Sequence, residues 1–318
     1  MTADRDKVAV SAPQTTRWNI EGIVSDLRDL RVRSLESRQR RDRPPKLPSR
    51  KVLVGIVEGL AAAMFPNRLG LPGLGDEGLV DYYVGHTLDV ALRELHEQVS
   101  RELQFASEEE RVMNADRERA VEITRAFAAK LPAVRALLDT DIIAAYEGDP
   151  AARSADEVLV CYPGITAMTH HRLAHELSCL GVPLIARMVA EIAHSATGID
   201  IHPGARIGES FFIDHGTGVV IGETTVIGQR VRLYQAVTLG AKRFEVGADG
   251  TLVKGAARHP IVEDDVVIYA GATILGRVTI GRGSTIGGNV WLTRSVPPDS
   301  NVTQAQARSE SFEGGGGI

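Results

Sequence analysis

The feature that most constrains this sequence is an aliphatic residue that recurs every six positions over its last third. A small or β-branched residue follows most of these aliphatic residues four positions later. A short fixed repeat is typical of a solenoid, in which each unit packs only on its neighbours. The spacing holds with one eight-residue step and one interruption at these positions: Ile201, Ile207, Ile213, Ile221, Ile227, Leu233, Leu239, Val262, Ile268, Ile274, Ile280, Ile286 and Leu292.

A six-residue period fits neither an amphipathic helix nor an alternating strand. It fits a β-helix in which each side of a coil is a short strand, the aliphatic residue points into a narrow lumen, and glycine forms the corners. Composition agrees, because 21 of the 32 glycines follow residue 197 and aromatic residues make up only 5% of the chain. With three repeats in each coil, the thirteen positions predict a little over four coils.

The region before the repeat has helical apolar spacing, so the predicted fold class is an α-helical domain followed by a parallel β-helix. The predicted segments are an N-terminal segment with a basic linker (1–50), the helical domain (51–197), the β-helix (198–300) with an inserted loop (240–260), and a flexible tail (301–318). A long loop in an otherwise regular solenoid is more often functional than decorative.

Charge and hydropathy argue against several classes of protein. The net charge of -5 disfavours attraction to nucleic acid. Residues 31–51 hold nine basic and two acidic residues, but three prolines and no aromatic residues favour a solvated linker over a nucleic-acid arm. No stretch approaches the ~20 apolar residues that span a bilayer, and the N-terminus lacks a signal-peptide core. We therefore expect a cytoplasmic protein with neither a membrane nor a nucleic-acid partner.

One histidine stands where the repeat breaks. His215 lies inside the eight-residue step, within the glycine-flanked segment 214–218, where a bulge would push its side chain out of the wall. Asp200 lies fifteen residues earlier, close to one coil, so the two side chains can stack. Such a histidine can serve as a general base for a hydroxyl group, with the carboxylate fixing its tautomer.

Four motifs resemble those of the serine O-acetyltransferases, which are hexapeptide-repeat acyltransferases. They are Asp-Ile-His-Pro at 200–203, Asp-His-Gly-Thr-Gly at 214–218, Val-Ile-Gly-Glu-Thr-Thr-Val-Ile-Gly at 220–228 and Arg-His-Pro at 258–260. The resemblance implies a left-handed β-helix assembled as a homotrimer or a dimer of trimers. It also implies direct transfer of acetyl from acetyl-CoA to the hydroxyl of L-serine, in cysteine biosynthesis, without a metal.

The resemblance also implies roles for individual residues. Carried onto this sequence, the catalytic residues are His215, Asp200 and His259, the serine-binding residues are Asp149, Asp214 and Arg258, and the acetyl-CoA residues are Gly240, Ala241, Ala270 and Gly288. An arginine can hold the serine carboxylate in a bidentate contact, and the aspartates can take its ammonium. The sequence departs from common relatives at Tyr269, where a small residue is usual, and at Thr285, where a lysine often faces CoA.

Some alternatives stay open at this point. The acceptor could be another hydroxyl or amine, such as a sugar, or the β-helix could be a non-catalytic scaffold. Two histidine sets can be compared with metal sites. His171 and His175 have helical spacing but lack the carboxylate of a zinc protease motif, and the spacing of His202, His215 and His259 differs from that of the three-histidine zinc site of γ-class carbonic anhydrases.

The C-terminal tail and the two cysteines give two further expectations. The chain ends in four glycines and Ile318. In several serine acetyltransferases, such an isoleucine inserts into the active site of O-acetylserine sulfhydrylase, so this enzyme is a predicted partner, against the alternative of a disordered tail. Cys161 and Cys179 are too few for a disulfide framework, and we expect both to be buried.

Overall fold

The computed structural model describes residues 18, 20–37, 46–71, 73, 76–106, 113–243, 247, 250–253 and 255–304. The chain forms two compact units, residues 1–46 and 47–318. The first contains helix α1 (Ile20–Ser37), which extends into the segment predicted to be a basic linker. The predicted sulfhydrylase contact at Ile318 lies outside the described residues.

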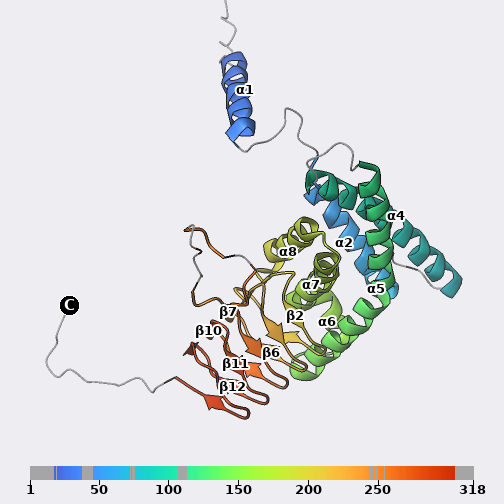
Figure 1. Cartoon of the computed structure of the whole chain (residues 1–318). Helices are drawn as coiled ribbons and strands as arrows, with labels where there is room; N and C mark the ends of the chain where they lie inside the picture. Colours follow the sequence, from blue (N-terminus) through green and yellow to red (C-terminus); the bar gives the residue numbers. More distant parts are fainter. Residues whose placement is uncertain are drawn as a thin grey trace, which may run out of the picture. The chain divides into compact units, whose positions relative to one another are not determined.

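The second unit begins with helices, as the apolar spacing predicts (Figure 1). Their shared core includes Leu53, Leu95, Phe127 and Ile185, each at most 1% exposed. The described helices are α2 (Arg50–Met64), α3 (Pro66–Leu69), α4 (Glu77–Ala106), α5 (Met113–Gly148), α6 (Ala155–Cys161), α7 (Pro163–Cys179) and α8 (Pro183–Thr197). Helix α8 ends at Gly198, whose φ of 71° is left-handed, so the chain turns at once into the first strand.

From Asp200 onward the chain winds as a parallel β-helix with three walls (Figure 1). We number the walls as sheets I, II and III, with strand orders β1-β4-β7-β10-β13, β2-β5-β8-β11 and β3-β6-β9-β12-β14. The strands are β1 (Asp200–Ile201), β2 (Arg206–Ile207), β3 (Phe212–Ile213), β4 (Val220–Ile221), β5 (Val226–Ile227), β6 (Arg232–Leu233), β7 (Thr238–Gly240), β8 (Ile261–Val262), β9 (Val267–Ile268), β10 (Thr273–Leu275), β11 (Thr279–Ile280), β12 (Thr285–Ile286), β13 (Trp291–Leu292) and β14 (Asn301–Val302).

The repeat positions line the lumen as predicted. In sheet I, the residues that stack in register are Ile201, Ile221, Leu239, Ile274 and Leu292. Eleven of the thirteen repeat positions are buried. The exceptions are Ile207, at the second position, and Leu292, at the last, which are half-buried. Burial of aliphatic side chains in this column is the main source of stability that a parallel β-helix has.

The β-helix is longer than the repeat predicts. Strand β14 and a bridge between Ile280 and Val296 add most of a further coil, so the described prism has close to five coils rather than a little over four. The sequence pattern misses this coil because Pro297 and Pro298 interrupt the six-residue period where the chain turns from sheet II to sheet III.

Two edges of the prism matter for the site. The I–II edge is the corner where the chain passes from sheet I to sheet II, and the III–I edge is the corner where it passes from sheet III to sheet I. The chain leaves the prism wall at the I–II edge after Gly240 and returns at Ile261, where the inserted loop was expected.

A buried ion pair joins the helices to the first coil. Asp141 of α5 is fully buried and accepts hydrogen bonds from Arg172 Nε at 2.6 Å and Nη2 at 2.8 Å. Arg172 also donates to the carbonyl of Gly208 at 2.9 Å, and Asp141 accepts from the Phe211 N–H at 3.0 Å. Because a buried carboxylate needs such partners, the network fixes the end of α5 against the prism.

Two other expectations concern burial and the membrane. Cys161 and Cys179 are both exposed, contrary to the expectation of burial. Cys161 is the last residue of α6 and Cys179 the last residue of α7, and both helix ends lie at the surface. Among the described helices, none combines the length and the apolar character that crossing a bilayer requires.

Candidate active site

His215 projects from the III–I edge, between β3 and β4. Its φ is 60°, and Gly216 and Gly218 have φ values of 91° and 80°, so the eight-residue step is a bulge built from left-handed residues. The His215 side chain is 70% exposed, as the predicted bulge requires. Ala236, at the same edge one coil later, is also left-handed, so this conformation belongs to the corner rather than to the histidine alone.

Asp214 is held beneath His215 by an arginine. Asp214 Oδ2 accepts a hydrogen bond from Arg232 Nη2 at 2.8 Å, and Asp214 Oδ1 lies 3.6 Å from His215 Nδ1. Arg232 also donates to the carbonyl of Gly148 at 2.7 Å and lies over the ring of Tyr234 at 4.7 Å. Arg232 therefore connects the buried Asp214 to the end of α5 and fixes the direction of its carboxylate.

Asp149 joins the same group from the helical domain. It follows α5 directly, and its Oδ2 accepts a hydrogen bond from the Tyr162 hydroxyl at 2.5 Å, while its Oδ1 accepts from the Ala151 N–H at 2.8 Å. The Tyr162 hydrogen bond lowers the pKa of Asp149 and raises the pKa of Tyr162 to about 12. Arg232 and His215 lower the pKa of Asp149 further. Asp149 is thus an ionised carboxylate near His215.

His259 lies at the I–II edge just before β8, and it is 7% exposed. Its Nδ1 accepts hydrogen bonds from the Thr224 N–H at 3.1 Å and pairs with Thr224 Oγ1 at 2.9 Å. Burial and then the charge of Arg258 lower the pKa of His259 to about 4. The ring is therefore neutral near pH 7, with its proton on Nε2, where it can act as a hydrogen-bond donor.

Arg258 stands beside His259 and is oriented by the preceding coil. Arg258 Nη2 donates to Glu223 Oε2 at 2.7 Å, and the Arg258 N–H donates to Thr224 Oγ1 at 2.9 Å. Gly222 makes this packing possible, because a Cβ at that position would overlap the His259 ring. The short segment 222–224 therefore sets the positions of both residues at the return of the loop.

The predicted site residues divide into two groups that lie on different edges. Asp149, Asp214 and His215 gather at the III–I edge, whereas Arg258 and His259 lie at the I–II edge. Electrostatic neighbours divide in the same way. The charges that act on His259 belong to Arg258, Glu223, His202 and Arg277, whereas those that act on Asp149 belong to Arg232 and His215. A single chain thus carries two separate groups of candidate residues, which we call half-sites.

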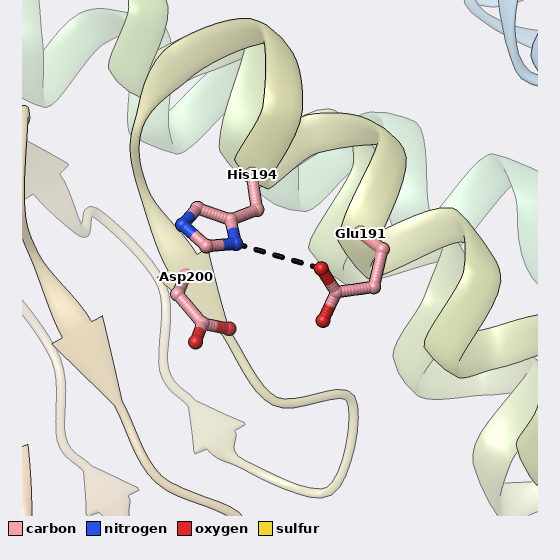
Figure 2. A group of neighbouring side chains, drawn as sticks. All are labelled: Glu191, His194 and Asp200. Atoms are coloured by element: carbon pink, nitrogen blue, oxygen red, sulfur yellow. Dashed lines mark ion pairs between the residues drawn. The ribbon is translucent and has the colours of Figure 1, made fainter.

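Asp200 lies in a different environment from the one expected. Figure 2 shows its carboxylate grouped with Glu191 and His194 of α8, where one ligand atom from each lies within 4.8 Å of the others. His194 Nδ1 is 3.5 Å from Glu191 Oε2, and Glu191 Oε1 accepts a hydrogen bond from Arg187 at 2.7 Å. Within the described part of the chain, no hydrogen bond or ion pair joins Asp200 to His215, so the expected pair is not closed here.

This group consists of two carboxylates and an imidazole, which are ligand types that can hold a divalent metal ion. The Arg187 contact places a positive charge on one of these carboxylates, which opposes a second cation.

The residues expected to contact acetyl-CoA also divide between the two edges. Gly240 and Ala241 lie at the I–II edge, where the Gly240 carbonyl accepts a hydrogen bond from the Gly276 N–H at 2.9 Å. Ala270 and Gly288 lie one coil apart at the III–I edge, where a Cβ on Gly288 would be 3.2 Å from the Ala270 carbonyl. Each edge therefore has small residues at the positions expected to contact acetyl-CoA, and small side chains let an extended arm come close to the backbone.

Comparisons with known proteins decide the family. Residues 259–294 match the family described as bacterial transferase hexapeptide (six repeats). The chain is 57% identical over 305 residues to the plasmid serine acetyltransferase of Synechococcus elongatus, which covers 95% of each chain. The chain belongs to the serine acetyltransferase family. The serine acetyltransferase of Mycobacterium tuberculosis is 48% identical over 179 residues, covering 55% of this chain and 74% of that protein.

Solved structures agree with this membership. Serine acetyltransferase 1 of Entamoeba histolytica, in complex with L-cysteine, has a TM-score of 0.69 and 36% identity, covering 83% of this chain and 90% of that one. The soybean serine acetyltransferase complexed with serine has a TM-score of 0.52 and 30% identity, covering 80% and 96%. The predicted fold class, helices followed by a left-handed β-helix, and the predicted acetyl-CoA-dependent acyltransferase class are confirmed.

Several residues of this candidate active site were not identified from the sequence. Arg232, Tyr162, Glu223 and Thr224 hold the expected functional residues in place. Glu223 and Thr224 lie inside the quoted motif 220–228, so the motif itself is their signal. Arg232 lies on β6, the neighbour of β3 in sheet III, so the repeat itself places it close to Asp214. Tyr162 had no such signal, because only the packing of α6 on α5 brings it to Asp149.

The two histidine sets considered as metal sites do not form one in the described structure. His175 Nδ1 pairs with the Pro203 carbonyl at 2.8 Å, and its Nε2 lies 3.6 Å from Cys179 Sγ. His171 is buried, which holds its pKa well below the usual value, and no third ligand groups with these two among the described residues. In the second set, His215 lies on a different edge from its two proposed partners.

Proposed function

We propose that the chain acetylates the hydroxyl of L-serine by direct transfer from acetyl-CoA, in a site that two neighbouring copies of the chain complete. The division of the site residues between two prism edges carries this proposal. Three prisms around a threefold axis can each present the III–I edge to the I–II edge of the next copy. A homotrimer then contains three complete sites, and two trimers can associate without changing them.

Serine binding uses charges from both half-sites. Asp149 and Asp214 hold the substrate ammonium at the III–I edge, and Arg258 of the adjacent copy holds its carboxylate. Glu223 keeps the Arg258 guanidinium in place through one Nη atom, which leaves other N–H groups for the substrate. Arg232 acts as a positioning residue, because it touches Asp214 rather than the substrate.

His215 is the general base of the proposed reaction. Its exposed imidazole accepts the proton of the serine hydroxyl while the hydroxyl oxygen attacks the thioester carbon. The tetrahedral intermediate then collapses, the C–S bond breaks, and the CoA sulfur receives the proton from His215. A carboxylate near Nδ1 stabilises the imidazolium form. In the single chain Asp214 occupies that place, and we propose that Asp200 takes part when the site is complete.

His259 of the adjacent copy supplies the donor for the negative charge. Its neutral ring carries a proton on Nε2, which can donate to the oxyanion that forms from the thioester carbonyl. Because its pKa is about 4, this ring stays neutral near pH 7 and keeps its Nε2 proton for the oxyanion. The base and the donor therefore have separate roles.

The acetyl-CoA arm is proposed to lie in the groove between copies, along Gly240 and Ala241 of one chain and Ala270 and Gly288 of its neighbour. The reaction needs no metal ion, because the two histidines provide the base and the oxyanion donor. The division of residues 51–300 into a helical support and a catalytic prism, and the cytoplasmic location, are further parts of this proposal.

The deciding assay mixes the protein with acetyl-CoA and L-serine and follows the release of thiol. Serine-dependent release is expected, with a loss of ~10²–10⁴-fold in His215→Ala and a smaller loss in Asp200→Ala. Homoserine and sugar acceptors are assayed beside serine. No serine-dependent release by the unmutated protein, or faster release with a sugar, would overturn the proposed substrate.

The predicted partner is tested separately. We propose that Ile318 binds the amino-acid site of O-acetylserine sulfhydrylase through its side chain and terminal carboxylate. Removing Ile318 alone is expected to abolish co-elution of the two proteins in gel filtration, while the acetyltransferase rate stays the same. Unchanged co-elution of the shortened protein would exclude this contact.

A further inference from the structure

Aromatic rings lie against the guanidinium of Arg232, the residue that holds Asp214. The guanidinium carbon lies over the Phe212 ring, 4.8 Å from its centre, and over the Tyr234 ring, 4.7 Å from its centre. The Tyr234 ring stacks in turn on the Tyr269 ring, with 5.0 Å between the ring centres and 9° between the planes. We call these four side chains, Phe212, Arg232, Tyr234 and Tyr269, the Arg232 column.

The register of the β-helix builds this column. Phe212 of β3 and Arg232 of β6 are partners in sheet III. Tyr234 and Tyr269 directly follow β6 and β9, which are also partners. Because Leu233 is buried in the lumen, the residues on either side of it point outward. The column therefore runs along the outside of sheet III, from the first coil to the third.

The aromatic rings take the place of a hydrogen bond that Arg232 lacks. Arg232 Nη1 donates to the Gly148 carbonyl and Nη2 donates to Asp214, but Nε is buried and has no hydrogen-bond partner among the described residues. A buried cation needs compensation, and the face of an aromatic ring attracts a guanidinium through its quadrupole. The Phe212 and Tyr234 rings therefore stabilise the charge and restrict the rotation of the guanidinium plane.

Tyr234 lies close to the charges of the III–I half-site, whereas Tyr269 lies at the surface. Burial raises the pKa of Tyr234, the charge of Arg232 lowers it, and the charges of Asp214 and Asp149 raise it. The overall shift is upward, so the Tyr234 hydroxyl keeps its proton near pH 7. Tyr269 is 43% exposed, and its ring covers one face of the Tyr234 ring. Tyr269 thus limits the movement of Tyr234, as Tyr234 limits that of Arg232.

We infer that Tyr234 and Tyr269 are positioning residues for serine binding. Their stacked rings fix the plane of the Arg232 guanidinium, and Arg232 in turn directs the Asp214 carboxylate toward the substrate ammonium. The inference rests on the proposed function, because that function assigns Asp214 to the ammonium. The contacts that carry this role are made by the ring faces, so phenylalanine can replace either tyrosine.

Steady-state kinetics of leucine and phenylalanine variants test this role. Leucine keeps an apolar side chain but has no aromatic face, whereas phenylalanine keeps the face. Tyr234→Leu is expected to raise KM for serine about five-fold, and Tyr269→Leu is expected to raise it about three-fold. Tyr234→Phe and Tyr269→Phe are expected to keep KM for serine within about two-fold of the unmutated value. In all four variants, kcat and KM for acetyl-CoA are expected to change less than about two-fold.

A double substitution distinguishes a role through Arg232 from a direct one. In the Arg232→Ala background, Tyr269→Leu is expected to raise KM for serine no further, because the column acts only through the guanidinium. Tyr82→Leu is the matched control, because Tyr82 stacks on His86 of α4, outside both half-sites, and its kinetics are expected to stay unchanged. Tyr269 is exposed, so Tyr269→Leu opens no internal cavity and tests the column even where Tyr234→Leu fails to fold.

The inference is wrong if Tyr269→Leu raises KM for serine equally with and without Arg232. It is also wrong if KM for acetyl-CoA rises in place of KM for serine, which would place Tyr269 in the acetyl-CoA groove. Unchanged KM for serine in both leucine variants would overturn the role of the column alone. No serine-dependent thiol release by the unmutated protein would overturn the proposed function and this role together.

Discussion

Because the candidate site is divided between two edges, two inactive variants should restore each other. His215→Ala removes the proposed base at the III–I edge, and Arg258→Ala removes the proposed carboxylate ligand at the I–II edge. Loss of the base is expected to lower the rate ~10²–10⁴-fold. Loss of a charge-assisted contact costs about 1.5–3 kcal/mol, which is about ten-fold or more in the rate at low serine concentration.

The magnitude of the restoration follows from the geometry of a trimer. When the two variants are unfolded together in equal amounts and refolded, each interface draws its III–I edge and its I–II edge at random. An intact site needs an unmutated III–I edge, with a chance of about one half, and an unmutated I–II edge, with the same chance. About a quarter of the sites are therefore intact. The mixture is expected to release thiol at about a quarter of the rate of unmutated protein refolded in the same way.

A matched pair shows whether the restoration depends on the edge. His215→Ala mixed with Asp214→Ala places both changes on the III–I edge, so no interface can have an unmutated half-site there, and no restoration is expected. Each variant is also refolded alone as a baseline. A His215→Ala and Arg258→Ala mixture no faster than the mean of its components would refute the shared site and place the whole reaction within one chain.

Other predictions follow from single contacts. Arg232→Ala removes the charge that fixes the buried Asp214 carboxylate, so KM for serine is expected to rise about ten-fold or more. Steady-state kinetics should show a smaller effect on kcat and partial rescue of KM by Arg232→Lys. Gly222→Ala would push the His259 ring from its place, so kcat is expected to fall while the circular dichroism spectrum is unchanged. The folded-state pKa of His259, about 4, lies below its unfolded value near 6.5, so the unfolded chain binds more protons between these pH values. The free energy of unfolding is therefore expected to fall as the pH decreases through this window. In His259→Gln, the slope of Tm against pH should be shallower.

The prism could be predicted from the sequence because each six-residue repeat forms one wall of one coil. A lumen admits one aliphatic side chain for each wall in each coil, and eleven of the thirteen predicted side chains are buried there. The last coil was missed because Pro297 and Pro298 interrupt the six-residue period at the corner between sheets II and III. The bulge at His215 was predicted for the same reason, since an irregular step in a strict period must leave the wall.

The separation of the half-sites could also have been counted from the sequence. Successive strands fall in turn on sheets I, II and III. Asp214 follows the third strand, on sheet III, and Arg258 follows the seventh, on sheet I, so the two residues lie at different corners. The repeat also places Arg232 close to Asp214, because the two residues lie on neighbouring strands of sheet III. The contact of Arg232 with the Gly148 carbonyl could not be counted, because a repeat pattern holds no information about where a preceding helix docks. The same reason hid the grouping of Asp200 with α8.

The buried ion pair between Asp141 and Arg172 has a consequence for how the enzyme can be shortened. Asp149 lies eight residues beyond Asp141, at the end of the same helix, so this pair sets the position of a proposed substrate ligand that it never touches. A fragment that begins at the first strand would keep His215, yet it would lose one of the two carboxylates proposed to hold serine and leave Asp214 without the carbonyl that anchors its arginine. Under the proposed function, the helices before the prism form one wall of the serine site, and the smallest active piece of the chain is expected to include them.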